Sequence, residues 1–203
     1  RSLANGVGDL KKVLSNVKVR GGWGEIMLSS LLEQMLAPSQ YMAQVQVRKG
    51  SKERVDFAVI MPGKNDSDVL LPIDSKFPLE DYNKLIEASE TLDKDLIDKC
   101  HKQLMKRVKD EAKSIKEKYI NVPETTDFAI MFLPIEGLYA EVIRDIELMD
   151  TLQNQLKVVV CGPTTLTALL NSLQLGFKTL HIEKRSSELW QVLSTFKQEF
   201  EKF

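Results

Sequence analysis

The sequence predicts an α/β fold, a sheet covered by helices with helical arms at both ends. Three short apolar segments follow one another at 42–48, 54–61 and 69–76, and two more occur at 127–133 and 157–161. Apolar runs of this length, rich in β-branched residues and bounded by Gly, Pro and Asn, are typical of buried strands. Amphipathic stretches separate the later strands, so we expect helices on the faces of the sheet.

Helices are predicted before, between and after these strands. Leu3 to Val17 carries an apolar residue every three or four positions, which is typical of the end of a coiled coil. We expect Gly21-Gly22 to break that helix and to separate a coiled-coil end at 1–20 from a domain at 21–203. The domain would have a core at about 21–165 and C-terminal helices over 163–203. Its further helices are predicted at 23–36, after Pro78, at 92–119 as a long charged helix, at 135–149 and from Pro163 onwards.

Composition narrows the class of protein. The 203 residues suit one domain, and 28 basic against 29 acidic residues give a formal net charge of -1. This balance excludes a protein that coats nucleic acid through bulk charge, so DNA binding would need a local patch or a metal site. Cys100 and Cys161 lack metal or disulfide spacing, which favours a reducing, cytoplasmic compartment. The chain has no signal peptide or membrane-length apolar run and opens on Arg1 within a helical pattern, so we expect a piece of a longer protein.

Two acids and a lysine occur near the ends of two predicted strands. Asp56 lies near the start of one strand, and Asp74-Ser75-Lys76 closes the next. Because side chains alternate between the faces of a strand, Asp74 and Lys76 share a face, and a hairpin would bring Asp56 to Asp74. Two carboxylates suit Mg²⁺, and a lysine stabilises a phosphate or orients the attacking water. The pattern predicts a metal-dependent phosphodiesterase site; the alternative is ordinary strand-end charges that block edge pairing.

Glu25 shares a helical stripe with Leu28, Leu32 and Met35, so we expect it to face the protein. A carboxylate in that position is costly without a partner, which a metal-bound water or a lysine would supply. The alternative is an acid in the first helical turn, favoured by the helix dipole.

Basic residues border the predicted site, and one further acid follows a later strand. The candidates for contact with the DNA backbone are Lys49, Lys52, Arg54 and Lys64; solvated loop charges are the alternative. Glu136 follows Pro134 where a helix opens, which favours a helix cap, and a supporting role beside the site is the other interpretation.

Five motifs follow one another along most of the chain. They are Gly22-Trp23-Gly24-Glu25, Val55-Asp56, Ile73-Asp74-Ser75-Lys76, Phe132-Leu133-Pro134-Ile135-Glu136 and Gly162-Pro163-Thr164-Thr165-Leu166. Their order resembles the RmuC family of DNA recombination proteins, within the PD-(D/E)xK nuclease-like superfamily. The resemblance implies a restriction-endonuclease-like core, a mixed central sheet flanked by helices. Val55 departs from the superfamily pattern, which has proline at this position.

The resemblance also implies roles for the acids and the lysine. Asp56 and Asp74 would match the two metal-binding acids, with the Ser75 carbonyl as a further ligand. Glu25 would match the helical glutamate and hold a metal-bound water, and Lys76 would position or activate the nucleophile. The implied cofactor is Mg²⁺ or Mn²⁺, and the implied reaction is hydrolysis of DNA phosphodiester bonds.

The family association is with limiting DNA rearrangement, such as inversion at inverted repeats. Full-length members carry an N-terminal membrane-anchoring segment and a coiled coil. We therefore expect DNA as the partner, self-association through the coiled coil, and attachment to the inner membrane only through a segment outside this sequence. A non-catalytic DNA-binding or scaffolding module that keeps the nuclease fold is the second hypothesis. An unrelated structural domain with surface acids is the third.

Overall fold

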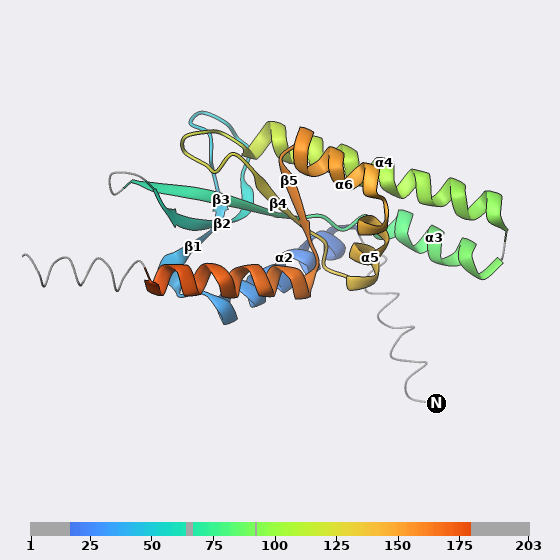
Figure 1. Cartoon of the computed structure of the whole chain (residues 1–203), viewed down its shortest axis with the longest axis horizontal. Helices are drawn as coiled ribbons and strands as arrows, with labels where there is room; N and C mark the ends of the chain where they lie inside the picture. The colour runs from blue at the N-terminus through green and yellow to red at the C-terminus, as the bar shows by residue number, and fades with distance from the viewer. Residues whose placement is uncertain (1–16, 64–66, 92, 180–203) are drawn as a thin grey trace, which may run out of the picture.

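The chain folds around one five-stranded sheet in the computed structural model, which describes residues 17–63, 67–91 and 93–179 (Figure 1). The strands are β1 (Tyr41–Val45), β2 (Val55–Pro62), β3 (Asp68–Ser75), β4 (Ala129–Phe132) and β5 (Val158–Cys161), and they lie in this order across the sheet. The first three pair antiparallel, whereas β4 and β5 run parallel to β3. The predicted mixed sheet flanked by helices is confirmed.

Helices cover both faces of this sheet. They are α2 (Val17–Met35), α3 (Leu79–Thr91), α4 (Lys94–Tyr119), α5 (Glu136–Arg144), α6 (Ile146–Asp150) and a helix over residues 163–179, with the short helices η1 (Pro38–Gln40) and η3 (Thr151–Gln155). Figure 1 shows α2 and the helix over 163–179 on one side of the sheet and α4 with α6 on the other. The pair α3 and α4 forms a helical hairpin that extends beyond the strands (Figure 1).

Two apolar clusters hold the layers together, one on each face. Leu28 and Leu32 of α2 pack with the helix over 163–179 against one face, and Leu104 and Ile115 of α4 pack against the other. Alternation along β4 divides its side chains between the clusters: Ile130 and Phe132 face α2, while Ala129 and Met131 face α4. Every residue of β4 is buried, and the neighbouring strand β5 also contributes buried side chains to both clusters.

Two helix predictions were wrong in detail. Gly21-Gly22 does not break a helix, because α2 runs through it from Val17. Each glycine costs a helix about 1 kcal/mol relative to alanine, a cost that burial of the leucines further along α2 exceeds. The predicted helix at 135–149 is divided at Asp145, whose carboxylate accepts a hydrogen bond from the Leu148 N–H at 2.9 Å and starts α6. The predicted coiled coil at Leu3 to Val17 lies outside the described residues except at its last position.

Candidate active site at the ends of β2 and β3

The structure brings Asp56 and Asp74 together. Phe57 of β2 pairs with Ile73 of β3, so the two acids occupy neighbouring positions at the end of the antiparallel ladder. The Asp56 Oδ2 atom accepts a hydrogen bond of 2.8 Å from the Ser75 N–H. The hairpin geometry expected from the sequence is therefore present, and the Asp56 side chain is fixed against the end of β3.

Asp74 is a buried acid whose partner is Lys76. Only 2% of the Asp74 side chain is exposed, and its Oδ2 atom forms an ion pair with the Lys76 ammonium, which is 25% exposed. Apart from that ammonium, no hydrogen-bond donor in the described part of the chain reaches Oδ2. Asp74 lies on the face of β3 that α4 covers, since it is in register with Met131 of β4. The carboxylate is thus held in an apolar layer with the Lys76 ammonium as its positive partner.

Burial and charge shift the ionisation of this cluster. Burial raises the pKa of Asp74 to about 6, against the opposing effect of Lys76 and with a contribution from Asp56. Burial also raises the pKa of Asp56, although the Ser75 N–H lowers it. Burial alone would lower the pKa of Lys76, but the charges of Asp74, Asp56 and Glu111 together outweigh it, so the pKa of Lys76 is raised and the ammonium stays charged. The cluster would accept additional positive charge.

Helix α2 approaches the end of β3 at Gly24. A Cβ atom at this position would lie 2.5 Å from the Ser75 Oγ atom and 3.5 Å from Pro134 Cγ, so only glycine fits the present spacing. The next residue, Glu25, is half-buried, and its negative charge contributes to raising the pKa of Asp56. Trp23 packs on Phe77 with ring centroids 5.6 Å apart. These contacts bring Glu25 to the same end of the sheet as the two aspartates.

Three further residues of the cluster were not identified from the sequence. Tyr119, at the end of α4, is buried, and burial together with the charges of Asp74 and Asp56 raises the pKa of its hydroxyl. The charge of Glu111, also on α4, acts on both Asp74 and Lys76. The Gln44 side chain, from a backbone position with φ of 51°, is among the groups that lower the pKa of Asp56. One signal was available, because a tyrosine on the buried stripe of a helix needs a hydrogen-bond partner.

The predicted DNA-contacting residues lie partly beside this cluster. Lys49, Lys52 and Arg54 are exposed on the segment that joins β1 to β2, at the end of β2 where Asp56 lies. The Arg54 Nη1 atom donates a hydrogen bond of 2.8 Å to the Gln44 carbonyl. Lys64 lies outside the described residues.

Glu136 is exposed in the first turn of α5, but the helix that its side chain caps is the one over residues 163–179. Its Oε1 atom accepts a hydrogen bond of 2.5 Å from the Thr164 N–H, in the first turn of the helix over 163–179. It also lies against Gly162, where an added Cβ would be 2.9 Å from Glu136 Oε2. Capping is therefore the observed contact of this acid.

The donor atoms at the cluster suit Mg²⁺ better than a softer metal. In the described part of the chain, no three His, Cys, Asp or Glu side chains are grouped as a metal site. Mg²⁺ commonly takes only one or two protein carboxylates and keeps several waters. Asp56 and Asp74 supply two carboxylates, and the buried Asp74 Oδ2 atom accepts no hydrogen bond from a neutral donor among the described residues.

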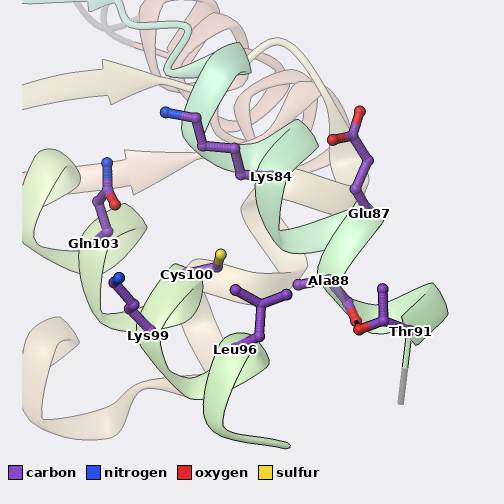
Figure 2. A pocket seen from close by; sticks show the side chains of 8 residues that line it. All are labelled: Lys84, Glu87, Ala88, Thr91, Leu96, Lys99, Cys100 and Gln103. Atoms are coloured by element: carbon purple, nitrogen blue, oxygen red, sulfur yellow. Dashed lines mark hydrogen bonds between the residues drawn. The ribbon is translucent and has the colours of Figure 1, made fainter. Parts of the chain in front are cut away.

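A separate pocket of about 360 Å³ lies between α3 and α4 (Figure 2). Lys84, Glu87 and Lys99 line it together with Leu96, and none of the predicted site residues does. Its lining mixes both signs of charge with apolar surface. The side chains predicted to form the site therefore lie at the strand ends, outside this pocket. Across the described residues, no helix is both long and apolar enough to span a bilayer.

Comparisons with known proteins identify the family. The RmuC family matches over residues 1–203. DNA recombination protein RmuC homologs from Xylella fastidiosa are 55% identical over 205 residues, covering 100% of this chain and 45% of their own length. A homolog from Chlamydia muridarum is 32% identical over 189 residues, with 90% of this chain and 41% of the relative covered. DNA recombination protein RmuC of Escherichia coli K12 is 26% identical over 193 residues, 88% of this chain and 39% of that protein.

The chain thus spans less than half the length of these curated relatives. No solved structure gives a significant match. The family match covers the whole chain and the relatives at 55% and 32% identity cover most of it, so the chain belongs to the RmuC family.

Proposed function

We propose that this domain is a Mg²⁺- or Mn²⁺-dependent DNA nuclease that hydrolyses phosphodiester bonds. The observation that carries the proposal is the meeting of half-buried Asp56 and buried Asp74 with Lys76 at one end of the β2–β3 hairpin. The relatives are named DNA recombination proteins, which supports DNA as the substrate. A role in limiting DNA rearrangement, such as inversion at inverted repeats, is part of the same proposal.

The residues of the cluster would have different roles in the reaction. Asp56 and Asp74, with the Ser75 carbonyl, would hold a divalent cation, which when bound neutralises charge on the phosphate. Lys76 is charged at neutral pH and extends from the strand end, so it stabilises the phosphate or orients the attacking water. Glu25 lies at the edge of the cluster, where its carboxylate would hold a water molecule.

The exposed cations beside the cluster would contact the DNA backbone. Lys49, Lys52 and Arg54 precede Asp56 in the chain, so a strand held by them passes the end of β2. We expect replacement of Lys49 and Lys52 by alanine to weaken DNA binding and to reduce its salt dependence, since each phosphate contact releases a counterion. A binding titration at several salt concentrations measures this; an unchanged salt slope would show that the two lysines do not bind DNA.

Loss of cleavage in matched variants tests the proposal. Asp74→Asn and Lys76→Met are expected to lower Mg²⁺-dependent cleavage by about 100-fold or more while folding and most DNA affinity remain. Lys113→Met removes the same charge as Lys76→Met from an exposed site on α4, 3.5 Å from Asp110, and should cleave like the unmodified chain. Failure of the unmodified chain to cleave single-stranded, duplex or branched DNA with either metal would reject the nuclease proposal.

A DNA-binding or scaffolding module is the second candidate. It is favoured by the contacts that both acids already make within the chain, the Lys76 ammonium on Asp74 and the Ser75 N–H on Asp56. Such a module would bind DNA equally well before and after Asp74→Asn and would not cleave it.

A further inference from the structure

We propose that Lys76 is a tethered cation that occupies Asp74 in the free protein, competes there with a divalent cation, and leaves when a DNA phosphate takes it up. The inference rests on the proposed function for the identity of the cation and of the phosphate. It goes beyond the proposed function because Lys76 would act before catalysis, by making metal binding depend on DNA binding.

The geometry limits where the Lys76 ammonium can go. The Lys76 N–H donates a hydrogen bond of 2.9 Å to the Phe132 carbonyl, which fixes its main chain at the end of β4. Its side chain reaches back two residues to Asp74 Oδ2, an atom that no neutral donor in the described part of the chain serves. A quarter of the Lys76 side chain is exposed, so the same ammonium can turn outward without movement of the strand.

The negative charges around Asp74 favour a cation of higher charge than one ammonium. Asp56 on β2 and Glu111 on α4 act on the pair, as does the Tyr119 hydroxyl from the end of α4, and Glu25 on α2 acts on Asp56. Arg107 forms an ion pair of 3.0 Å with Glu111 on the outer side of α4, so the charge of this one acid already has a partner. Among the described residues, Lys76 is the cation that acts on Asp56 and Asp74, so a divalent cation at Asp74 would be favoured over one ammonium once that ammonium has another partner.

A DNA phosphate supplies that partner. When Lys76 pairs with a phosphate, Asp74 loses its competitor and binds the divalent cation more tightly. Because the coupling is reciprocal, the cation must strengthen DNA binding by the same factor. The free protein would therefore hold metal weakly and complete its site on DNA.

Metal titrations without DNA test the competition directly. Calorimetric titration of Mn²⁺ into the chain should give at least about tenfold tighter binding for Lys76→Met, with Lys76→Gln as a second variant, because the competing charge is gone. Lys113→Met, which changes net charge equally, should bind like the unmodified chain. Adding Asp74→Asn to Lys76→Met should abolish the gain. Equal or weaker binding by both Lys76 variants, or a gain that survives Asp74→Asn, would overturn the inference.

Two further measurements use the unmodified chain. A phosphorothioate oligodeoxynucleotide, which resists hydrolysis, should tighten Mn²⁺ binding to the unmodified chain but not to Lys76→Met; equal tightening in both would refute the coupling. Mn²⁺ should also speed reductive methylation of Lys76 relative to Lys113, read by mass spectrometry, and an unchanged ratio would count against displacement. The first titration contains neither DNA nor turnover, so it can fail in an active nuclease or succeed in an inactive one.

Discussion

Ionisation of Asp74 should lower the stability of the metal-free protein. Burial raises the pKa of this acid to about 6 in the folded chain, although Lys76 opposes the shift, whereas its ordinary value is 3.8. The folded protein therefore holds the proton more tightly than the unfolded chain does. A variant with Asn at position 74 keeps the shape but cannot ionise, so it isolates the effect.

The magnitude follows from the two pKa values. A difference between about 6 and 3.8 corresponds to about 3 kcal/mol of unfolding free energy. Because the folded value is the higher one, this stability is fully present below pH 3.8 and is lost as the pH rises through about 6. The pKa of Asp56 is raised as well, so it contributes with the same sign.

Urea unfolding of both proteins between about pH 4 and pH 8 measures the effect. Near pH 4 the protonated Asp74 resembles Asn, and the two proteins should be similarly stable. By pH 8 the advantage of Asp74→Asn should have grown by about 3 kcal/mol. Asp110→Asn, at an exposed residue of α4, should show no such trend. A stability difference between Asp74→Asn and the parent that does not change with pH would refute the reasoning.

Two smaller changes test the contacts around the site by the same unfolding assay. Gly24→Ala should lower stability by about 1–2 kcal/mol because its Cβ would lie 2.5 Å from Ser75 Oγ. Gly22→Ala, with nothing within 4 Å, should raise stability by about 1 kcal/mol, and equal effects of the two changes would contradict the close approach of α2. Glu136→Gln should cost about 1 kcal/mol through the helix that it caps. Glu141→Gln, which affects an exposed pair, should cost little, and the reverse order would contradict the capping role.

Much of the fold could be predicted because its signals are local. The apolar runs located all five strands, and the hairpin of β2 and β3 considered from the sequence is present. The parallel addition of β4 and β5 was not predictable in the same way, since it depends on long connections through α3 to α6. The glycines in α2 and the division at Asp145 were misjudged because packing and a local cap outweighed helix propensity.

The candidate site shows the same division between local and distant contacts. Asp56, Asp74 and Lys76 were grouped from the sequence because strand alternation and one hairpin determine their positions. Tyr119 and Glu111 were missed because they reach Asp74 from α4, and periodicity along a helix does not reveal which strand residue it will cover.

The position of Asp74 is hard to explain by folding alone. It lies in register with Met131 in an apolar layer, where a leucine or valine would add buried apolar surface without the cost of a buried charge. Lys76 offsets that cost only in part, since the pKa of Asp74 remains raised. A carboxylate kept under these conditions is favoured by an additional cation and disfavoured without one. A buried carboxylate with incompletely balanced charge destabilises a purely structural domain. The same feature is expected of a metal site without its cation.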